Sequence, residues 1–296
     1  MWILAVDGGG SKTLARLTNT STGQHWQQQG GPASLTNDFS LALSNINLLS
    51  ASLCLQAGVS SQQVVAVMGL AGAGNPQQHQ QACQQLARHY ARFLLTTDAK
   101  TSLYGANLGR PVLVVALGTG SVAMRLLADG TEQQVGGWGF NIGDEGGGAW
   151  LGKQAVRELL WQVDSLAGIK SPLLQAVAQQ IGDDATVLLP WLKTASPNDY
   201  AALAPLVFNY AGRCDIADTL LQRHSAAVHQ LLWSAREQFE LPVVLLGGLA
   251  DITAPLLSTE CRALLQAARG SALDGAFILA TQLTNSLPLS GNGDDK

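Results

Sequence analysis

The sequence predicts an α/β fold of two lobes, and three observations support this. Strand-like runs alternate with helix-like segments, which is typical of a sheet whose ligand loops lie at strand ends. One pattern, an apolar strand, a turn of glycine and hydroxyl residues and an alternating strand, occurs in both ILAVDGGGSKTLARLT and VLVVALGTGSVAMRL. A chain of 296 residues that is 47% hydrophobic can bury two cores. We therefore expect lobes at residues 1–108 and 109–289, with the last helix able to return to the first lobe, and a disordered tail at 290–296.

The elements of the first lobe follow from the hydrophobic pattern. Residues 2–6 are an apolar run that ends at Asp7, and residues 13–18 alternate apolar and polar side chains, which predicts a hairpin. Apolar residues recur at helical spacing through 39–57, and Gly58 is expected to end that helix. The other predicted elements are strands at 24–30, 64–69 and 93–97, a helix over 77–90 that Pro76 opens, and a short helix after Asp98.

The second lobe begins with the repeated strand pattern and continues with a long helical region. A third strand is expected at 133–136, and a helix over 154–164 follows the glycine-rich stretch GGWGFNIGDEGGGAWLG. Residues 172–240 have a helical pattern with proline and glycine breaks. The segment LPVVLLGGLAD predicts another strand that ends in paired glycines, and a last helix is expected over 271–285. The cleft between the two lobes is the expected ligand site.

Charge and cysteine usage narrow the classes of function. The net charge is −4, with 17 basic and 21 acidic residues and no long basic block, which argues against nucleic-acid binding. No leader peptide is evident and no uncharged stretch is expected to span a membrane, so we predict a cytoplasmic protein. The five histidines lack ligand spacing and are expected at the surface. Four scattered cysteines argue against a zinc site, an iron–sulfur site or a disulfide framework: Cys54, Cys83, Cys214 and Cys261.

The stretch DGGGS is a candidate phosphate loop. Glycine lets backbone N–H groups approach a phosphate and lets a turn take positive φ. The stretch is not a Walker A motif, because Ser11 and not glycine precedes Lys12, and a strand rather than a helix follows it. A tight hairpin with no ligand therefore remains an alternative. Two similar loops at strand ends, 118–121 and 247–248, favour one nucleotide site built from three loops.

These loops, together with SLTN at 34–37, TTDAKTS around Asp98 and the stretch GGWGFNIGDEGGGAWLG, resemble one known group of proteins. They are similar to the N-acetylglucosamine kinase and BadF-type ATPase branch of the actin, hexokinase and heat-shock chaperone superfamily. The resemblance covers nearly the whole chain. It implies two ribonuclease-H-like lobes with a nucleotide cleft between them, the cofactors ATP and Mg²⁺, and a homodimer.

The resemblance also implies a role for each matching residue. Asp7 would place the metal through water, and Asp98 would be the general base that accepts the proton of a sugar hydroxyl. The adenosine side would be lined by Gly247 and Gly248. The phosphates would be held by Gly8, Gly9, Gly10, Ser11, Lys12, Gly118, Thr119 and Gly120. The sugar contacts would be Asn37, Asp98, Ser121, Val122, Gly137, Trp138, Gly139, Phe140, Asn141, Asp144 and Glu145.

Structural alternatives remain for several of these residues. Asp98 could be the N-cap of a helix over 99–107, and Asp144 with Glu145 could be an acidic first helical turn. Trp138 could stack on a sugar or only pack against the protein. The leading expectation is transfer of the γ-phosphoryl group of ATP to O6 of N-acetylglucosamine, with no nucleic-acid or membrane partner. The alternatives are a glucosamine kinase of the same fold and a BadF-type activator or switch ATPase.

Overall fold

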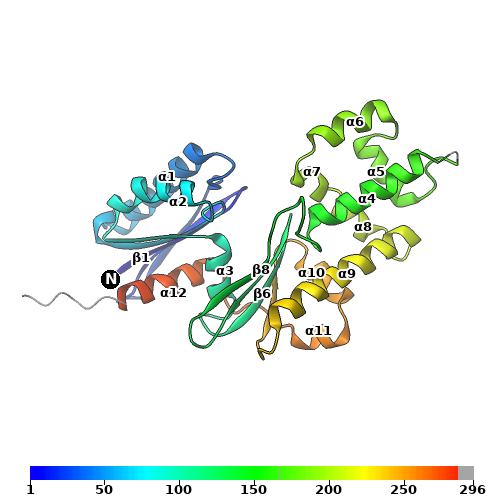
Figure 1. Cartoon of the computed structure of the whole chain (residues 1–296). Helices are drawn as coiled ribbons and strands as arrows, with labels where there is room; N and C mark the ends of the chain where they lie inside the picture. Colours follow the sequence, from blue (N-terminus) through cyan, green and yellow to red (C-terminus); the bar gives the residue numbers. More distant parts are fainter. Residues whose placement is uncertain (166, 286–296) are drawn as a thin grey trace, which may run out of the picture. The chain divides into compact units, whose positions relative to one another are not determined.

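The computed structural model describes residues 1–165 and 167–285, and these form two compact units (Figure 1). The first unit contains Met1–Arg110 together with the described residues from Ala268 to Asn285, and the second contains the described residues of Pro111–Ala267. The second unit is thus inserted between two pieces of the first. The predicted tail at 290–296 lies outside the described residues.

The first unit is built on a five-stranded sheet in the order β3-β2-β1-β4-β5. β1 pairs antiparallel with β2, so the predicted hairpin is confirmed, and β1 also pairs parallel with β4. Every residue of β4 is buried, which is typical of a strand that helices cover on both faces. The strands are β1 (Trp2–Gly8), β2 (Thr13–Asn19), β3 (His25–Gly30), β4 (Val64–Leu70) and β5 (Arg92–Thr96).

Helices cover both faces of this sheet. Figure 1 shows α1 and α2 on one face and α3 with α12 on the other. α1 begins after Asp38, whose side chain accepts a hydrogen bond from the Leu41 N–H, and ends at Gly58 with φ 65°, as predicted. α2 ends four residues earlier than predicted because Ala87–His89 tightens into a 3₁₀ turn. The helices are α1 (Phe39–Ala57), α2 (Pro76–Leu86), α3 (Asp98–Ala106) and α12 (Ala272–Asn285), and a 3₁₀ turn lies at Ser61–Gln63.

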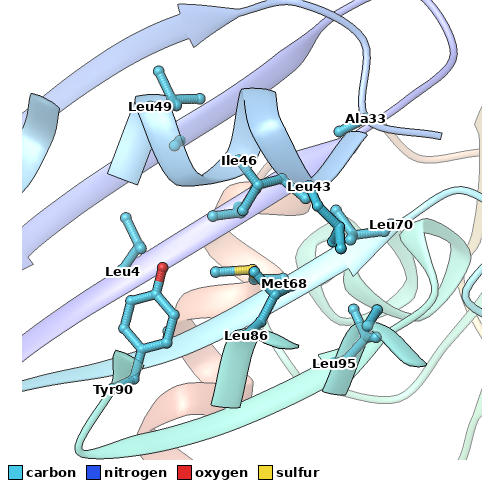
Figure 2. Close-up of a cluster of buried hydrophobic side chains, with 14 of the residues drawn as sticks. Leu4, Ala33, Leu43, Ile46, Leu49, Met68, Leu70, Leu86, Tyr90 and Leu95 are labelled. Atoms are coloured by element: carbon cyan, nitrogen blue, oxygen red, sulfur yellow. The ribbon is translucent and has the colours of Figure 1, made fainter. Parts of the chain in front are cut away.

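The core of the first unit lies between α1 and the sheet. Figure 2 shows Leu43 and Ile46 of α1 directed toward Met68 and Leu70 of β4. α1 has no charged residue and is the one helix, among the described residues, that is long and apolar enough to cross a membrane. Seven of its residues are buried in the protein, and they recur at the spacing of one helix face.

The sequence left open whether the last helix returns to the first lobe. In the structure this helix, α12, belongs to the first unit and packs against α3. The two helices approach so closely that a Cβ added at Gly275 would lie 1.8 Å from the Thr101 carbonyl oxygen. A Cβ at Gly105 of α3 would lie 2.0 Å from the Ser271 carbonyl oxygen. An ion pair of 2.7 Å between Arg16 and Asp274 also joins α12 to β2. Glycine is required at both contacts because no side chain fits there.

The second unit repeats the strand order of the first. Its sheet is ordered β8-β7-β6-β9, with β6 antiparallel to β7 and parallel to β9. Leu265 forms a parallel bridge with Val243 of β9. It therefore lies beside β9 in the place that β5 occupies beside β4 in the first sheet. The duplicated sequence pattern therefore corresponds to a duplicated topology. The strands are β6 (Val112–Leu117), β7 (Ser121–Leu126), β8 (Glu132–Gly136) and β9 (Val243–Leu246).

The inserted helices of the second unit pack among themselves and against its sheet. α9 lies along β6, β7 and β8, and its residues Val228 and Leu232 enter the core with Leu113. α4 begins six residues earlier than predicted, because the run of three glycines that leads into its first residue, Gly148, conceals the helix start. The helices are α4 (Gly148–Val163), α5 (Pro172–Ile181), α6 (Ala185–Thr194), α7 (Pro197–Ala201), α8 (Ala204–Asn209), α9 (Asp215–Arg236), α10 (Ala250–Thr253) and α11 (Thr259–Leu264), with a 3₁₀ turn at Ala254–Leu256.

Candidate functional site

The DGGGS loop of the first unit joins β1 to β2. Its turn is closed by the Gly9 N–H, which donates to the Lys12 carbonyl oxygen over 3.0 Å. Gly8, Gly9 and Gly10 do not have positive φ, so this turn does not use the positive φ that glycine allows. Gly8 is required for a different reason. A Cβ there would lie 2.6 Å from Leu70 Cδ2, so a side chain would push the loop away from the sheet.

Asp7 and Asp98 form a pair of half-buried carboxylates near this loop. Burial raises the pKa of Asp7, the charge of Asp98 raises it further, and Lys12 partly offsets both effects. Burial also raises the pKa of Asp98. Hydrogen bonds from backbone N–H groups lower this pKa, but the effect of burial is larger. The parallel strands explain the approach, because Asp7 is in register with Gly69 of β4, and Gly69 is in register with Thr96 of β5.

The alternative that Asp98 caps its helix is wrong by one residue. The Thr97 hydroxyl oxygen accepts the hydrogen bond from the Lys100 N–H over 3.1 Å, so Thr97 is the N-cap. Asp98 is the first residue of α3, and its Oδ1 accepts a hydrogen bond of 2.9 Å from the Ala99 N–H. The Asp98 side chain is therefore not the cap of the helix and remains a candidate for contact with a ligand.

The raised pKa of Asp98 leads to a prediction about pH. A general base works only when it is deprotonated, so we expect kcat/KM to fall as the pH drops through the pKa of Asp98. Because burial raises this pKa, the acid limb should lie above 3.8, the ordinary value for aspartate. A pH–rate profile with ATP and a hexosamine measures it. Full activity maintained down to pH 3.8 would contradict this assignment.

Asn37 lies beside the same glycine loop. It is exposed, and its backbone N–H donates to the Ser34 hydroxyl over 3.3 Å. A Cβ added at Gly10 would lie 3.3 Å from Asn37 Nδ2, so the amide lies next to the end of the loop. The first unit thus brings together an amide, a glycine turn and the carboxylate pair. Ser11 and Lys12 are exposed at the turn.

The glycine loops of the second unit meet at the ends of β6 and β9. The Gly148 N–H donates to the Gly118 carbonyl oxygen over 2.8 Å, and the Leu249 N–H donates to the Leu117 carbonyl oxygen over 3.0 Å. Gly247 has φ 96°, and a Cβ there would lie 2.3 Å from the Leu117 oxygen. Only glycine fits this position, because both its backbone conformation and its surroundings exclude a side chain.

Two polar residues that the sequence analysis did not assign to the site, Asn198 and His224, support these loops. Thr119 donates through its hydroxyl to Asn198 Oδ1 over 3.0 Å, across 79 positions of the chain. His224 of α9 bonds Thr253 Oγ1 through Nε2 over 2.8 Å and thereby holds α10, which follows Gly248. His224 is 0% exposed, so the expectation that it lies at the surface is wrong. The apolar periodicity of α9, which places His224 on the face of Leu220 and Val228, was the signal that could have found it.

Burial of His224 makes the second unit sensitive to acid. Burial lowers the pKa of His224 from 6.5 to about 4. The unfolded state therefore takes up the proton first, and the free energy of unfolding falls as the pH drops from 6.5 toward 4, by about 2 kcal/mol at pH 5. We expect His224→Gln, which can keep a bond to Thr253, to remove this contribution. The test is thermal unfolding of the wild type and of His224→Gln at pH 7 and at pH 5. If both proteins lose the same stability between these pH values, His224 is not the source of the acid sensitivity.

Asp144 lies against the GTGS loop, with an unusual backbone conformation. Its φ is 62°, its Oδ1 accepts a hydrogen bond of 3.0 Å from the Gly139 N–H, and burial raises its pKa. A Cβ added at Gly120 would lie 2.3 Å from Asp144 Oδ2. α4 begins only at Gly148 and has no acidic residue in its first turn, so the alternative of an acidic first turn is wrong. Strain of this kind is typical of ligand sites.

The turn after β8 borders a hollow of about 480 Å³ within the second unit. Trp138 is 82% exposed and lines the hollow with Gly137 and Glu145. Ser121 lies at its buried side, where the hydroxyl donates to the Glu145 carbonyl oxygen over 2.7 Å. The other proposed sugar contacts lie as follows: Val122 is beside Gly137, Gly139 binds Asp144, and Asn141 is exposed.

Phe140 does not present its ring to a ligand. Its ring centroid lies 5.1 Å from that of Tyr200, and Lys153 Nζ lies 4.5 Å above the ring. The Phe140 side chain therefore anchors the turn to the helical core of the second unit. Only its backbone remains a candidate for a sugar contact.

Two units, each with a strand hairpin and a glycine loop, match a known family over most of the chain. Residues 4–261 match the BadF/BadG/BcrA/BcrD ATPase family. This chain belongs to the BadF/BadG/BcrA/BcrD ATPase family. The resemblance inferred from the sequence is thereby confirmed.

Relatives of this family member are named as sugar kinases. The chain is 28% identical to the glucosamine kinase GspK of Vibrio cholerae, over 98% of this chain and 99% of the relative. A crystal structure from Chromobacterium violaceum, described as a "putative N-acetylglucosamine kinase", is 34% identical, with a TM-score of 0.84 over 94% of this chain and 98% of that one. A ROK-family glucokinase from Streptomyces griseus, 14% identical with a TM-score of 0.52 over 96% and 99%, shows the shared fold alone. The predicted two-lobed actin-like fold is thus confirmed.

The carboxylate pair of this ATPase-family protein fits a magnesium ion. Among residues 1–165 and 167–285, no group of three or more His, Cys, Asp or Glu side chains could hold a metal by itself. Mg²⁺ is commonly bound by one or two carboxylates together with substrate phosphates. The charge of Asp98 raises the pKa of Asp7, and a cation beside the two carboxylates would relieve that repulsion. All four cysteines are free thiols.

Proposed function

We propose that this protein transfers the γ-phosphoryl group of ATP to O6 of N-acetylglucosamine, and that glucosamine is the second candidate acceptor. The observation that carries the proposal is Asp98, a half-buried carboxylate beside Asp7 at the end of the first unit's sheet, in a chain whose relatives are named hexosamine kinases. Glucosamine is retained because GspK aligns with nearly the entire chain. Two carboxylates, Asp144 and Glu145, also border the hollow and could bind an ammonium group.

The proposed reaction assigns each residue a task. The acceptor hydroxyl gives its proton to Asp98 as its oxygen bonds to the γ-phosphorus, and the bond from that phosphorus to ADP breaks. Backbone N–H groups of the glycine loops at 8–10 and 118–120 donate to the phosphates, and Gly247 with Gly248 lines the adenosine. Ser11, Lys12 and Thr119 add side-chain donors.

Sugar recognition is assigned to groups that donate and accept hydrogen bonds. The amide of Asn37 and the carboxylate of Asp144 suit the hydroxyls of a pyranose, and the exposed ring of Trp138 offers an apolar face. Asp7 would hold Mg²⁺, which neutralises the charge that develops on the phosphates. We also propose a cytoplasmic location, for which the free thiols are suited, and a homodimer, which light scattering tests.

The test is ADP release measured with Mg-ATP and a panel of four sugars. N-acetylglucosamine is expected to accelerate it most, with glucosamine next, and N-acetylmannosamine and glucose to have little effect. Mass spectrometry of the product identifies a hexosamine phosphate, and NMR locates it at O6. Slow ADP release that no sugar changes would sink the kinase proposal and favour a switch ATPase.

A further inference from the structure

One face of the first unit carries almost no charge. Between residues 17 and 87, Asp38 is the only Asp, Glu, Lys or Arg, although a charged share of 13% would give about nine in these 71 positions. This segment supplies α1 and α2, and Figure 1 shows both helices on the same face of the sheet. A surface that another protein covers is depleted of charged residues at its centre. The composition of this face therefore indicates a docking surface.

α1 adds a regular row of leucines to the uncharged face. Leu41, Leu48 and Leu55 are 45%, 69% and 84% exposed, and they follow one another at steps of seven residues. Seven residues are almost two helical turns, so the three side chains lie in one row along the helix. Between them, at steps of three and four residues, lie the small exposed residues Ser44 and Ala51. We call these five residues the α1 stripe.

The α1 stripe is complementary to a second copy of itself. When two such helices pack antiparallel, each leucine faces a small residue of the other copy, so the layers interdigitate. When they pack parallel, leucine faces leucine, and gaps remain beside Ser44 and Ala51. The pattern of large and small residues is nearly the same in both directions from Leu48. An antiparallel pair is therefore closed by a twofold axis near this residue.

Charge and area also favour a second copy as the partner. Charged groups of a partner would lose their hydration here and gain no ion pair, so the partner's surface must itself be uncharged. A second copy supplies such a surface. A stable interface buries about 800 Å² on each partner, and α1, about 28 Å long, supplies an apolar centre that is only part of this area. α2 extends it with a polar rim of exposed glutamines: Gln77, Gln80, Gln81, Gln84 and Gln85.

We propose that the α1 stripe joins two copies of this chain, by antiparallel packing of their α1 helices around a twofold axis near Leu48. The proposal rests on the homodimer proposed above and assigns its interface to the first unit. The contact lies on the opposite face of the sheet from α3 and α12 (Figure 1).

The test is the molar mass in solution, measured by light scattering and by sedimentation over a range of protein concentrations. Leu48→Glu places two carboxylates near the twofold axis, so we expect the dissociation constant of the dimer to rise at least about tenfold. Leu48 is exposed and glutamate favours a helix, so α1 should persist, which circular dichroism verifies. Leu189→Glu, at a leucine of α6 that is 65% exposed, is the matched control and should change the constant less than about threefold.

A charge swap shows whether the α1 stripe meets its own copy. We expect Leu48→Lys to weaken the dimer as Leu48→Glu does, and a mixture of the two variants to form mixed dimers, because opposite charges then meet near the axis. Failure of the mixture to dimerise would overturn the inference.

The remaining outcomes separate the interface from the proposed function. If the wild type is a dimer and Leu48→Glu weakens it less than tenfold, or no more than Leu189→Glu does, the interface lies elsewhere; the inference is overturned and the homodimer stands. If the wild type is a monomer at every concentration, the inference and the homodimer both fail. Phosphoryl transfer is tested independently by the ADP-release assay.

Discussion

Replacement of Asp98 by Asn is expected to lower kcat for phosphoryl transfer by about 10²- to 10⁴-fold, the usual contribution of a general base. Asparagine keeps the size of the side chain and can still accept the hydrogen bond from the Ala99 N–H. Thr97 remains the cap, so α3 should persist. Binding of ATP and sugar, measured by calorimetry, should change little, while ADP release measures the loss.

The stability of the same variant separates a catalytic role from a structural one. The buried charge of Asp98 is costly, since burial raises its pKa and its charge raises that of Asp7. Removing the charge should leave the melting temperature unchanged or higher. Asp184→Asn, at the exposed cap of α6, is the control and should keep full activity. Normal turnover in Asp98→Asn would show that another group accepts the proton.

Substitution of Gly275 by Ala is expected to loosen α12 from α3. Alanine favours a helix over glycine by about 1 kcal/mol, but its Cβ would lie 1.8 Å from the Thr101 carbonyl oxygen. Backbone cannot move aside as a flexible side chain can, so the clash should outweigh the propensity and destabilise the first unit by about 2 kcal/mol or more. Since Asp98 is the first residue of α3, kcat should also fall.

Hydrogen exchange followed by mass spectrometry measures this loosening locally. Amides of α12 and α3 should exchange faster in Gly275→Ala, while those of the second unit stay unchanged. Gly74→Ala is the matched control, because a Cβ there meets only Thr97 Cγ2 at 3.7 Å. If the amides of α12 exchanged as slowly as in the wild type, the interface between α12 and α3 would accommodate a methyl group, contrary to this prediction.

Local patterns in the sequence predicted most of the fold. The alternation in β2 and the apolar run of β1 identified the hairpin, and Gly58 marked the end of α1 correctly. The start of α4 was placed too late because glycine carries no helical signal, although Gly148 and Gly152 face the protein interior. The predicted helix boundaries were wrong where the residues have low helix propensity, because tertiary packing decides the conformation there.

The candidate site was predictable only in part. The glycine loops stand out in the sequence because they follow apolar strands, but the reason for Gly8 is a contact with Leu70, which no local pattern contains. In TTD, any of three residues could cap α3, and the geometry selects Thr97. The contact of Thr119 with Asn198 joins segments that are distant in the chain, so it leaves no local signature.

The insertion of the second unit into the first has a consequence for synthesis of the protein on the ribosome. The second unit, Pro111–Ala267, is a continuous segment and can fold as soon as it has emerged. The first unit is completed later, because α12 is made after the second unit and packs against α3. At about 5–20 residues each second, the strands around Asp7 spend roughly 10 to 40 seconds without their final helix. The half of the protein that begins the chain is thus the last to be completed, and a chaperone that protects nascent chains would act on it.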